Sequence, residues 1–191
     1  AITVDVASAD SVRVAFARTL QVLGGVDGAF NNAGIGAPSV ATEMIEEADY
    51  NAVLDINLKG VWLCMREQIR HFKANGGGVI VNNASVAGLV ALATQAAYCA
   101  AKHGVIGLAR SVALEVARGP VTVNAICPGY IDTEINHQHW QTRQGQKLME
   151  MLPRKRVGQA KDLDALLVML CADQSHFING AVISADDGFG T

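Results

Sequence analysis

The chain has 191 residues, of which half are hydrophobic and 17% are charged, and its formal net charge at pH 7 is -3. This composition excludes a disordered chain, and the slight negative charge excludes the basic surface of a nucleic-acid-binding protein. The length is that of one domain with a substantial core. We therefore expect a single domain over residues 1–191 that binds a small molecule and no nucleic acid.

Short segments rich in Val and Ile alternate with longer segments of helical period, a pattern typical of βαβ units around a parallel sheet. In chain order, the predicted strands are a possible one at Ala1–Val4, then Val26–Asn31, Gly78–Ala84, Val121–Cys127 and Ala181–Ala185. The predicted helices are Ser11–Leu23, Glu43–Ala74, Gln95–Arg118 and Leu163–Ala172. The polar segment Asp132–Arg156 fits neither pattern, and we expect an elaborated loop or short helices there.

Two further features bear on where the protein works. The longest purely apolar run, Ala165–Ala172, is too short to span a membrane, and the first ten residues lack the apolar core of a signal peptide. The cysteines are widely spaced inside apolar segments, which favours buried free thiols over disulfides or a metal site: Cys64, Cys99, Cys127 and Cys171. We expect a cytoplasmic protein without a membrane partner or a metal.

Tyr98 and Lys102 lie four positions apart in a predicted helix, so their side chains share one face. The same stripe continues through Val105, Ala109 and Val112, so this face points toward the core. A phenol beside an ammonium group has a lowered pKa, which would make it usable as an acid or base. The alternative is a packed tyrosine and a lysine whose stem reaches solvent.

Small and polar residues follow each of the four main predicted strands. The four segments are Asn31–Gly34, Asn83–Ser85, Pro128–Gly129 and Asp186–Gly188. In open α/β sheets, ligands bind outside the carboxyl ends of the strands, and the helix that holds Tyr98 starts at the same edge. These segments therefore converge on one candidate site.

Together these residues resemble the short-chain dehydrogenase/reductase family in its compact single-domain branch. Tyr98 to Lys102 resembles the family's Tyr-x-x-x-Lys signature, and Ser85 lies thirteen positions before Tyr98, at the spacing of the family's catalytic serine. Asn31-Asn32-Ala33-Gly34 resembles its Asn-Asn-Ala-Gly turn, and Asn57 in INLKGVW matches its helix asparagine. CPGYIDT resembles its Pro-Gly-x-Ile-x-Thr segment, and the resemblance runs in order over essentially the whole chain.

The resemblance implies an oxidoreductase that moves a hydride between NAD or NADP and a carbonyl or secondary alcohol. Tyr98 would exchange the proton and Ser85 would stabilise the developing oxyanion. Lys102 would lower the pKa of Tyr98 and bind the nicotinamide ribose, while Asn57 would hold a water that relays protons to Lys102. From the residues alone, Ser85 can also be a turn cap, Lys102 a solvated lysine and Asn57 a stabiliser of a helix kink.

The resemblance also implies a set of cofactor contacts. On the adenosine side, Asp5 would contact the adenine amine, and the adenosine would be lined by Asn31, Ala33 and Gly34. On the nicotinamide side, the ring would be bordered by Pro128, Gly129, Ile131 and Thr133, and the ribose would be bound by Tyr98 and Lys102. The alternative for the glycines and asparagines is a tight turn after a strand, and for Asp5 an ordinary turn residue.

The segment Asp132–Arg156 corresponds to the family's variable substrate-covering region. Trp140 and the polar residues beside it, His137, Gln138 and His139, suggest a small polar or sugar-like substrate, and the two histidines lack a third metal ligand. Arg154, Lys155 and Arg156 would face an anionic substrate or carrier, or simply solvent. The alternative activity is a 3-oxoacyl-thioester (acyl carrier protein) reductase. The resemblance implies a homo-oligomer, a dimer or tetramer paired through the long helices.

One departure concerns the glycine-rich turn after the family's first strand, which binds pyrophosphate. Gly24, Gly25 and Gly28 precede a predicted strand, while Gly34 and Gly36 lack a third glycine and a helix start. In the strand order 3-2-1-4-5-6, the first two predicted strands would be strands three and four. We expect a doubly wound, Rossmann-like α/β sheet that is N-terminally incomplete, as part of a longer enzyme. An alternative of another class is an inactive truncated subunit or binding module.

Overall fold

The computed structural model describes residues 1–134 and 136–190. In that part of the chain four parallel strands form the main sheet, in the order β1 (Gly28–Asn31), β2 (Gly78–Asn83), β3 (Val121–Pro128) and β6 (Val182–Ala185). A small second sheet pairs β4 (Ile131–Asp132) with β5 (Gly158–Gln159). The expected parallel α/β sheet is confirmed, and its four main strands lie within two residues of their predicted bounds.

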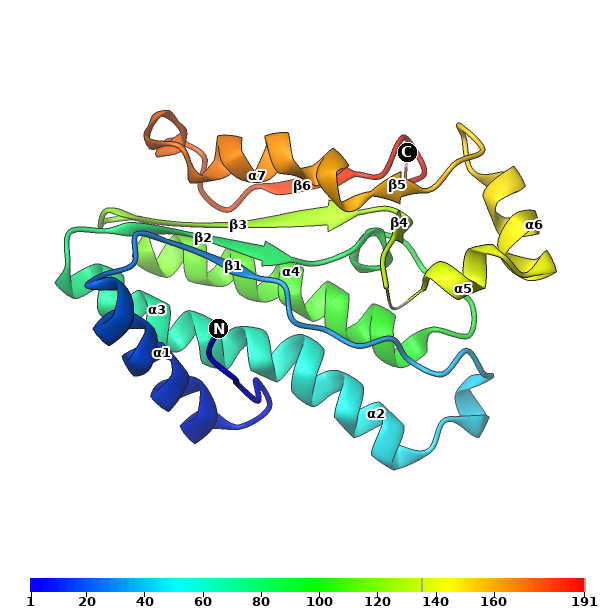
Figure 1. Cartoon of the computed structure of the whole chain (residues 1–191), viewed down its shortest axis with the longest axis horizontal. Coiled ribbons are helices and arrows are strands. Elements are labelled where there is room, and N and C mark those ends of the chain that lie inside the picture. The colour runs from blue at the N-terminus through cyan, green and yellow to red at the C-terminus, as the bar shows by residue number, and fades with distance from the viewer. Residues whose placement is uncertain (135, 191) are drawn as a thin grey trace.

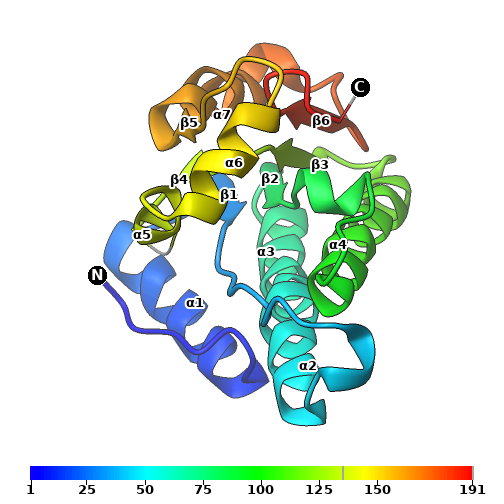
Figure 2. The ribbon, with the colours of Figure 1, turned by 90° about the vertical axis from the view of Figure 1, so that its right-hand side faces the viewer.

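Helices cover both faces of the main sheet (Figure 1). On one face lie α3 (Gly60–Ala74) and α4 (Ala96–Val116), with α1 (Ala9–Leu23) packed on α3, and on the other lies α7 (Asp164–Cys171). The short helices α5 (His137–Trp140) and α6 (Arg143–Met151) stand beside the carboxyl ends of the strands (Figure 2). They occupy the segment for which the sequence predicted short helices.

Two predicted elements differ from the structure. Ala1–Val4 is not a strand, because no described strand lies beside it to pair with, and these residues are exposed. The helix predicted at Glu43–Ala74 divides into a 3-10 turn (Thr42–Met44), α2 (Glu47–Leu54), a π-helical turn (Asp55–Lys59) and α3. The π turn inserts an extra residue into the helical ladder, and it is centred on Asn57.

The core lies mainly between the sheet and the pair α3 and α4. All eight residues of β3 are buried, as expected for a central strand covered on both faces. The largest fully buried side chains on the α3 and α4 side include Phe72, Met65, Ile80 and Val123. Burial of each such side chain contributes about 1.5–3 kcal/mol, so this layer fixes the frame that carries the rim of the sheet.

A buried amide network ties the edge strand β1 to its neighbours. Parallel register places Asn31 opposite Asn82, and the Asn31 Nδ2 donates to Asn82 Oδ1 at 2.8 Å and to Gln68 Oε1 at 3.1 Å. The Gln68 Nε2 returns a bond of 2.7 Å to Asn31 Oδ1. Buried amides need such partners, so Gln68 on α3 completes the hydrogen bonding of Asn31.

Substitution of Gln68 tests this network. Gln68→Met keeps the side-chain length but removes the bond to Asn31 Oδ1 and one of the two bonds made by Asn31 Nδ2. We therefore expect the free energy of unfolding to fall by about 2 kcal/mol. Gln174→Met, in an exposed turn, is the matched control and should change stability by less than about 0.5 kcal/mol. Denaturant unfolding measures both, and equal stabilities of the two variants would contradict the network's role.

Candidate active site

The carboxyl ends of β1, β2 and β3 meet at the right-hand edge of the sheet in Figure 1, where α4 begins. Figure 2 looks onto this edge, with α5 and α6 beside it. Ser85 follows β2, and Tyr98 and Lys102 occupy the first two turns of α4. The structure therefore brings these three predicted residues together at one rim.

Lys102 is buried, with 4% of its surface exposed. Its Nζ donates a hydrogen bond of 2.7 Å to the backbone oxygen of Asn83 at the end of β2. The same Nζ lies 5.6 Å from the ring centroid of Tyr98. Burial disfavours the charged form and lowers the pKa of Lys102 to about 8. Lys102 is thus charged at neutral pH but close to losing its proton.

Tyr98 is hydrogen-bonded through its side chain to Ser85. Burial raises the pKa of the Tyr98 phenol above its ordinary value, and the bond to Ser85 lowers it only in part. The sequence led us to expect a lowered pKa next to Lys102, and the structure differs because burial outweighs the hydrogen bond with Ser85. The resting side chain is therefore a neutral phenol that can donate a proton.

The Ser85 side chain has a second, structural contact. Its Oγ accepts a hydrogen bond of 3.1 Å from the backbone N–H of Ala87 and caps the 3-10 turn Val86–Gly88. A Cβ on Gly88 would lie 2.7 Å from the backbone oxygen of Lys102, so only glycine allows this turn to approach α4 so closely. The turn-cap interpretation of Ser85 is therefore confirmed, the cap helps to hold Ser85 against α4, and its catalytic role stays a prediction.

Asn57 is completely buried and clamps the loop that follows β1. Its Oδ1 accepts from the Ile35 N–H at 2.7 Å, and its Nδ2 donates to the Ile35 oxygen at 2.8 Å. A Cβ on Gly34 would lie 3.1 Å from Asn57 Oδ1, which explains the glycine there. These bonds match the kink-stabilising alternative, while the water relay to Lys102 stays a prediction.

The four asparagines of the first two strand ends divide into two pairs. Asn31 and Asn82 point toward α3, whereas Asn83 donates a bond of 2.6 Å to Asn32 Oδ1 on the other face. The Asn31 side chain is therefore engaged in the core, and a cofactor contact there would involve its backbone. The sequence placed Asn83 at this edge without giving it a role, and its Oδ1 is buried without a partner in the described part of the chain. Strand alternation applied to Asn82 and Asn83 would have separated the two.

The loop after β3 is fixed at both ends. A Cβ on Gly129 would lie 2.7 Å from the Asp186 Cα, so glycine is required where this loop crosses the C-terminal loop. Farther on, Asn136 Oδ1 accepts from the backbone N–H and the hydroxyl of Thr133, at 2.8 and 3.2 Å. Asn136 was missed by sequence reasoning, since nothing local to it distinguishes an organising asparagine from a surface one.

The same asparagine accepts a bond of 3.2 Å from Trp140 Nε1. Trp140 is only 4% exposed, and its ring meets Tyr130 edge-on, with centroids 5.8 Å apart. Trp140 therefore anchors α5, contrary to the expectation that it would contact a substrate. His137 is paired with Asp132 at 3.0 Å.

The remaining predicted cofactor residues lie on the rim or next to it. Ala33 and Gly34 stand in the loop after β1, Pro128 ends β3, and Ile131 begins β4. Asp5 is exposed in the turn before α1, where its Oδ1 accepts from the Ala7 N–H at 2.9 Å. That bond fits the alternative of an ordinary turn residue, and the contact with adenine stays a prediction.

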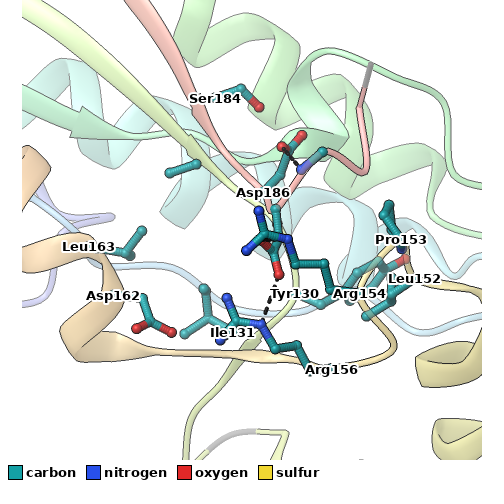
Figure 3. Close-up of a pocket in the computed structure, with 15 residues that line it drawn as sticks. Tyr130, Ile131, Leu152, Pro153, Arg154, Arg156, Asp162, Leu163, Ser184 and Asp186 are labelled. Atoms are coloured by element: carbon teal, nitrogen blue, oxygen red, sulfur yellow. Dashed lines mark hydrogen bonds and ion pairs between the residues drawn. The ribbon is translucent and has the colours of Figure 1, made fainter.

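A cavity of about 470 Å³ opens where β3 and β6 end (Figure 3), and its lining includes none of Ser85, Tyr98 and Lys102. Its walls come from the loop after β3, the C-terminal loop and the segment between α6 and β5. The described residues include no group of three or more His, Cys, Asp or Glu side chains that could hold a metal ion. Within the same residues, no helix is long and apolar enough to cross a membrane.

The lowered pKa of Lys102 predicts how stability depends on pH. The unfolded lysine, of pKa about 10.4, holds a proton that the folded one loses near pH 8, so folding becomes more favourable as the pH rises. Relative to Lys102→Met, wild-type unfolding free energy should rise by roughly 2 kcal/mol between pH 7 and pH 10. Exposed Lys73→Met is the control. A constant difference across this range in denaturant titrations would show that the burial does not perturb Lys102.

Comparison with known proteins agrees with this geometry. The family profile described as enoyl-(acyl carrier protein) reductase matches residues 1–190. Levodione reductase of Leifsonia aquatica is 34% identical over 96% of this chain and 72% of that protein, and D-threitol dehydrogenase of Mycolicibacterium smegmatis is 36% identical over 97% and 71%.

Solved structures give the same result. The crystal structure of levodione reductase superposes with a TM-score of 0.92, covering 98% of this chain and 75% of that one. ElxO with NADP bound is 28% identical with a TM-score of 0.91, over 97% and 76% of the two chains. The 3-ketoacyl-(acyl-carrier-protein) reductase of Brucella melitensis complexed with NADH has the same identity and TM-score, over 100% and 78%. The chain belongs to the short-chain dehydrogenase/reductase family of NAD(P)-dependent oxidoreductases.

Proposed function

We propose that this protein interconverts a carbonyl group and a secondary alcohol on a small, polar substrate, with NAD or NADP as the hydride carrier. The observation that supports this most directly is the meeting of Ser85, Tyr98 and Lys102 at the carboxyl edge of a parallel sheet. Ligands of open α/β sheets bind at this edge, and the hydroxyl pair faces a site where a carbonyl oxygen could be held.

The rim has features that fit a nicotinamide dinucleotide. Asn83 Oδ1, which is buried without a hydrogen-bond partner among the described residues, belongs to the residue whose backbone oxygen binds Lys102. It can accept a hydrogen bond from a ligand. Small residues in the loops after β1 and β3 allow a ligand to approach the backbone. The residues that we propose to hold the cofactor are Asp5, Asn31, Ala33, Gly34, Tyr98, Lys102, Pro128, Gly129, Ile131 and Thr133. When bound, the cofactor supplies or removes the hydride.

The chain's own residues supply the proton and the polar contacts. Ser85 donates a hydrogen bond to the substrate oxygen as negative charge grows there. Tyr98, neutral at rest because its pKa is raised, donates its proton to that oxygen during reduction and takes it back during oxidation. The ammonium group of Lys102, 5.6 Å from the ring centroid, stabilises the phenolate that remains. Asn57 would hold the water that restores the proton through Lys102.

Reduction of a 3-oxoacyl thioester is the second candidate. The Brucella melitensis neighbour, described as a 3-ketoacyl-(acyl-carrier-protein) reductase, favours it. Against it, Arg154 and Arg156 are both paired with Asp187, so their charges are already engaged inside the chain. Turnover of a 3-oxoacyl thioester in preference to polar ketones and polyols would establish this alternative.

Tyr98→Phe tests the proposed chemistry in the protein purified as its full natural chain. Loss of the proton donor should reduce turnover by about 10²-fold or more. Cofactor affinity, measured by nicotinamide fluorescence, should stay within about threefold, because the ring and Lys102 remain. Tyr50→Phe on the exposed surface of α2 is the matched control. Unchanged turnover in Tyr98→Phe would contradict the assignment.

We also propose that the protein assembles as a homo-oligomer through α3 and α4. A shallow, largely apolar groove runs between α4 and the segment from the end of α2 to the start of α3. It is lined by Leu54, Leu58, Trp62, Gly104, Gly107 and Leu108, together with the polar residues Asp55, Lys59 and Ser111. Trp62 is 43% exposed in the single chain, which is unusual for so large an apolar side chain. A second copy presenting the same face would cover it, since isologous pairing is the commonest way for identical subunits to associate.

Gly107→Arg tests this interface. A Cβ at Gly107 meets nothing within 4 Å, so the isolated chain accommodates the change, whereas a subunit packed over the groove would not. We expect the purified variant to have half or a quarter of the wild-type mass by light scattering, with unchanged helical content. Gly36→Arg, equally open in the single chain, is the control and should keep the wild-type mass. An unchanged mass in Gly107→Arg would place any oligomer contact elsewhere.

A cytoplasmic location completes the proposal. All four cysteines are free, and three are at least partly buried. Cys171 is exposed, contrary to the expectation that all would be buried. Free thiols of this kind are typical of proteins in a reducing compartment.

A further inference from the structure

Asp187, in the C-terminal loop, adopts an unusual backbone conformation. Its φ is 59°, in the left-handed region that residues with a side chain rarely enter, although aspartate and asparagine tolerate it better than most. Such an unfavourable backbone conformation persists only where surrounding contacts enforce it, and residues of this kind are frequent at functional sites. The contacts of Asp187 show what holds it.

Both carboxylate oxygens of Asp187 are used, each by a different arginine. Arg154 Nε lies 3.2 Å from Oδ1, and Arg156 Nε lies 2.9 Å from Oδ2. Lys155 between them is also left-handed, with φ 52°, so the chain bends between the two guanidinium groups. Figure 3 shows both arginines extending along the cavity below Asp186.

The C-terminal loop itself is firmly attached to the rim. The Asp186 carboxylate accepts hydrogen bonds from the backbone N–H groups of Gly188 and Gly190, at 3.0 and 2.9 Å. Phe189 packs edge-on against Tyr130, with centroids 5.3 Å apart. Asp187 thus lies in a loop that is fixed by these contacts, and its side chain contacts the segment that follows α6.

That segment is held from its other end by different contacts. Its larger part, residues 136–156, begins with Asn136, which is bonded to Thr133 and to Trp140 as described above. α6 packs against α5 so closely that a Cβ on Gly145 would overlap the His139 backbone. Residues 152–156, between α6 and β5, are exposed except for Leu152, and two ion pairs to Asp187 connect them to the C-terminal loop before β5 pairs with β4.

We propose that Asp187 is a positioning residue that holds the substrate-covering segment (residues 136–156) closed beside the active site, acting through Arg154 and Arg156. Exposed ion pairs are individually weak and are screened by salt, so this link can open without disturbing the core. A cover that must admit a substrate and then close needs such a reversible attachment. Its connection with turnover rests on the proposed function, but the attachment itself does not.

Hydrogen exchange tests the attachment directly. Asp187→Asn keeps a residue that tolerates the left-handed region and removes only the charge. We expect amide exchange in residues 143–156 to accelerate by about fivefold or more, with β2 and α4 unchanged. Asp10→Asn, which breaks the exposed pair with Arg13 on α1, is the matched control and should leave residues 143–156 unaffected. Unchanged exchange in Asp187→Asn would overturn the proposal.

Two further variants separate this role from a general effect on folding. Asp187→Gly relieves the backbone strain yet lacks the carboxylate, so it should accelerate exchange as Asp187→Asn does, at equal or greater thermal stability. Asp187→Glu keeps the charge and should restore most of the protection. If Asp187→Gly exchanged like the wild type, strain rather than the ion pairs would explain the asparagine result and the proposal would fail.

Kinetics extends the test to turnover. A loosened cover should raise KM several-fold in Asp187→Asn while kcat stays within about twofold, because Ser85, Tyr98 and Lys102 are not touched. A fall in kcat with unchanged KM would contradict a positioning role. If the wild type turned over none of the substrates tested, the proposed function would be in doubt, while the exchange results would still decide the attachment.

Discussion

The buried ammonium group of Lys102 imposes the constraint on which the arrangement of the active site depends. An unpaired charge in a protein interior is very costly, and here the backbone oxygen of Asn83 compensates for lost water. This bond fixes the register of α4 against the end of β2. One helical turn earlier, the same register places Tyr98 beside Ser85. The close approach that Gly88 allows is therefore as necessary to the site as the polar residues themselves.

Parallel register and strand alternation explain the division of labour among the asparagines. Asn31 pairs in register with Asn82, so their side chains share one face and reach Gln68 on α3. The next residue of each strand end points the other way, which brings Asn32 to Asn83. A single repeated dipeptide therefore supplies both a buried bond between strands and polar groups at the rim.

The sequence predicted those parts of the structure that depend on local pattern. Hydrophobic period located the main helices and strands, and the order of the motifs brought Ser85, Tyr98 and Lys102 to one edge. The π turn at Asn57 was not predictable, because it depends on bonds to Ile35, 22 residues away. Burial of Trp140 depends likewise on Tyr130 and Asn136, whereas the polar residues around it suggested a ring that stacks on a substrate. Ala1–Val4 had the composition of a strand, but pairing needs a neighbour that local pattern does not supply.

Ser85, Tyr98 and Lys102 are held by stronger interactions than the covering segment is, which suggests how the site can keep a precise geometry and still admit a substrate. Ser85, Tyr98 and Lys102 stand on elements packed against β3, whose residues are buried throughout, so displacing them would disturb the core. Between α6 and β5, the side chains that hold the covering segment are buried Leu152 and two exposed ion pairs, and water and salt readily weaken the ion pairs. Opening the cover should therefore require far less free energy than moving the catalytic groups. Because the two costs arise from different interactions, the proposed function implies that changes in the covering segment alter substrate choice while the geometry of Ser85, Tyr98 and Lys102 stays the same.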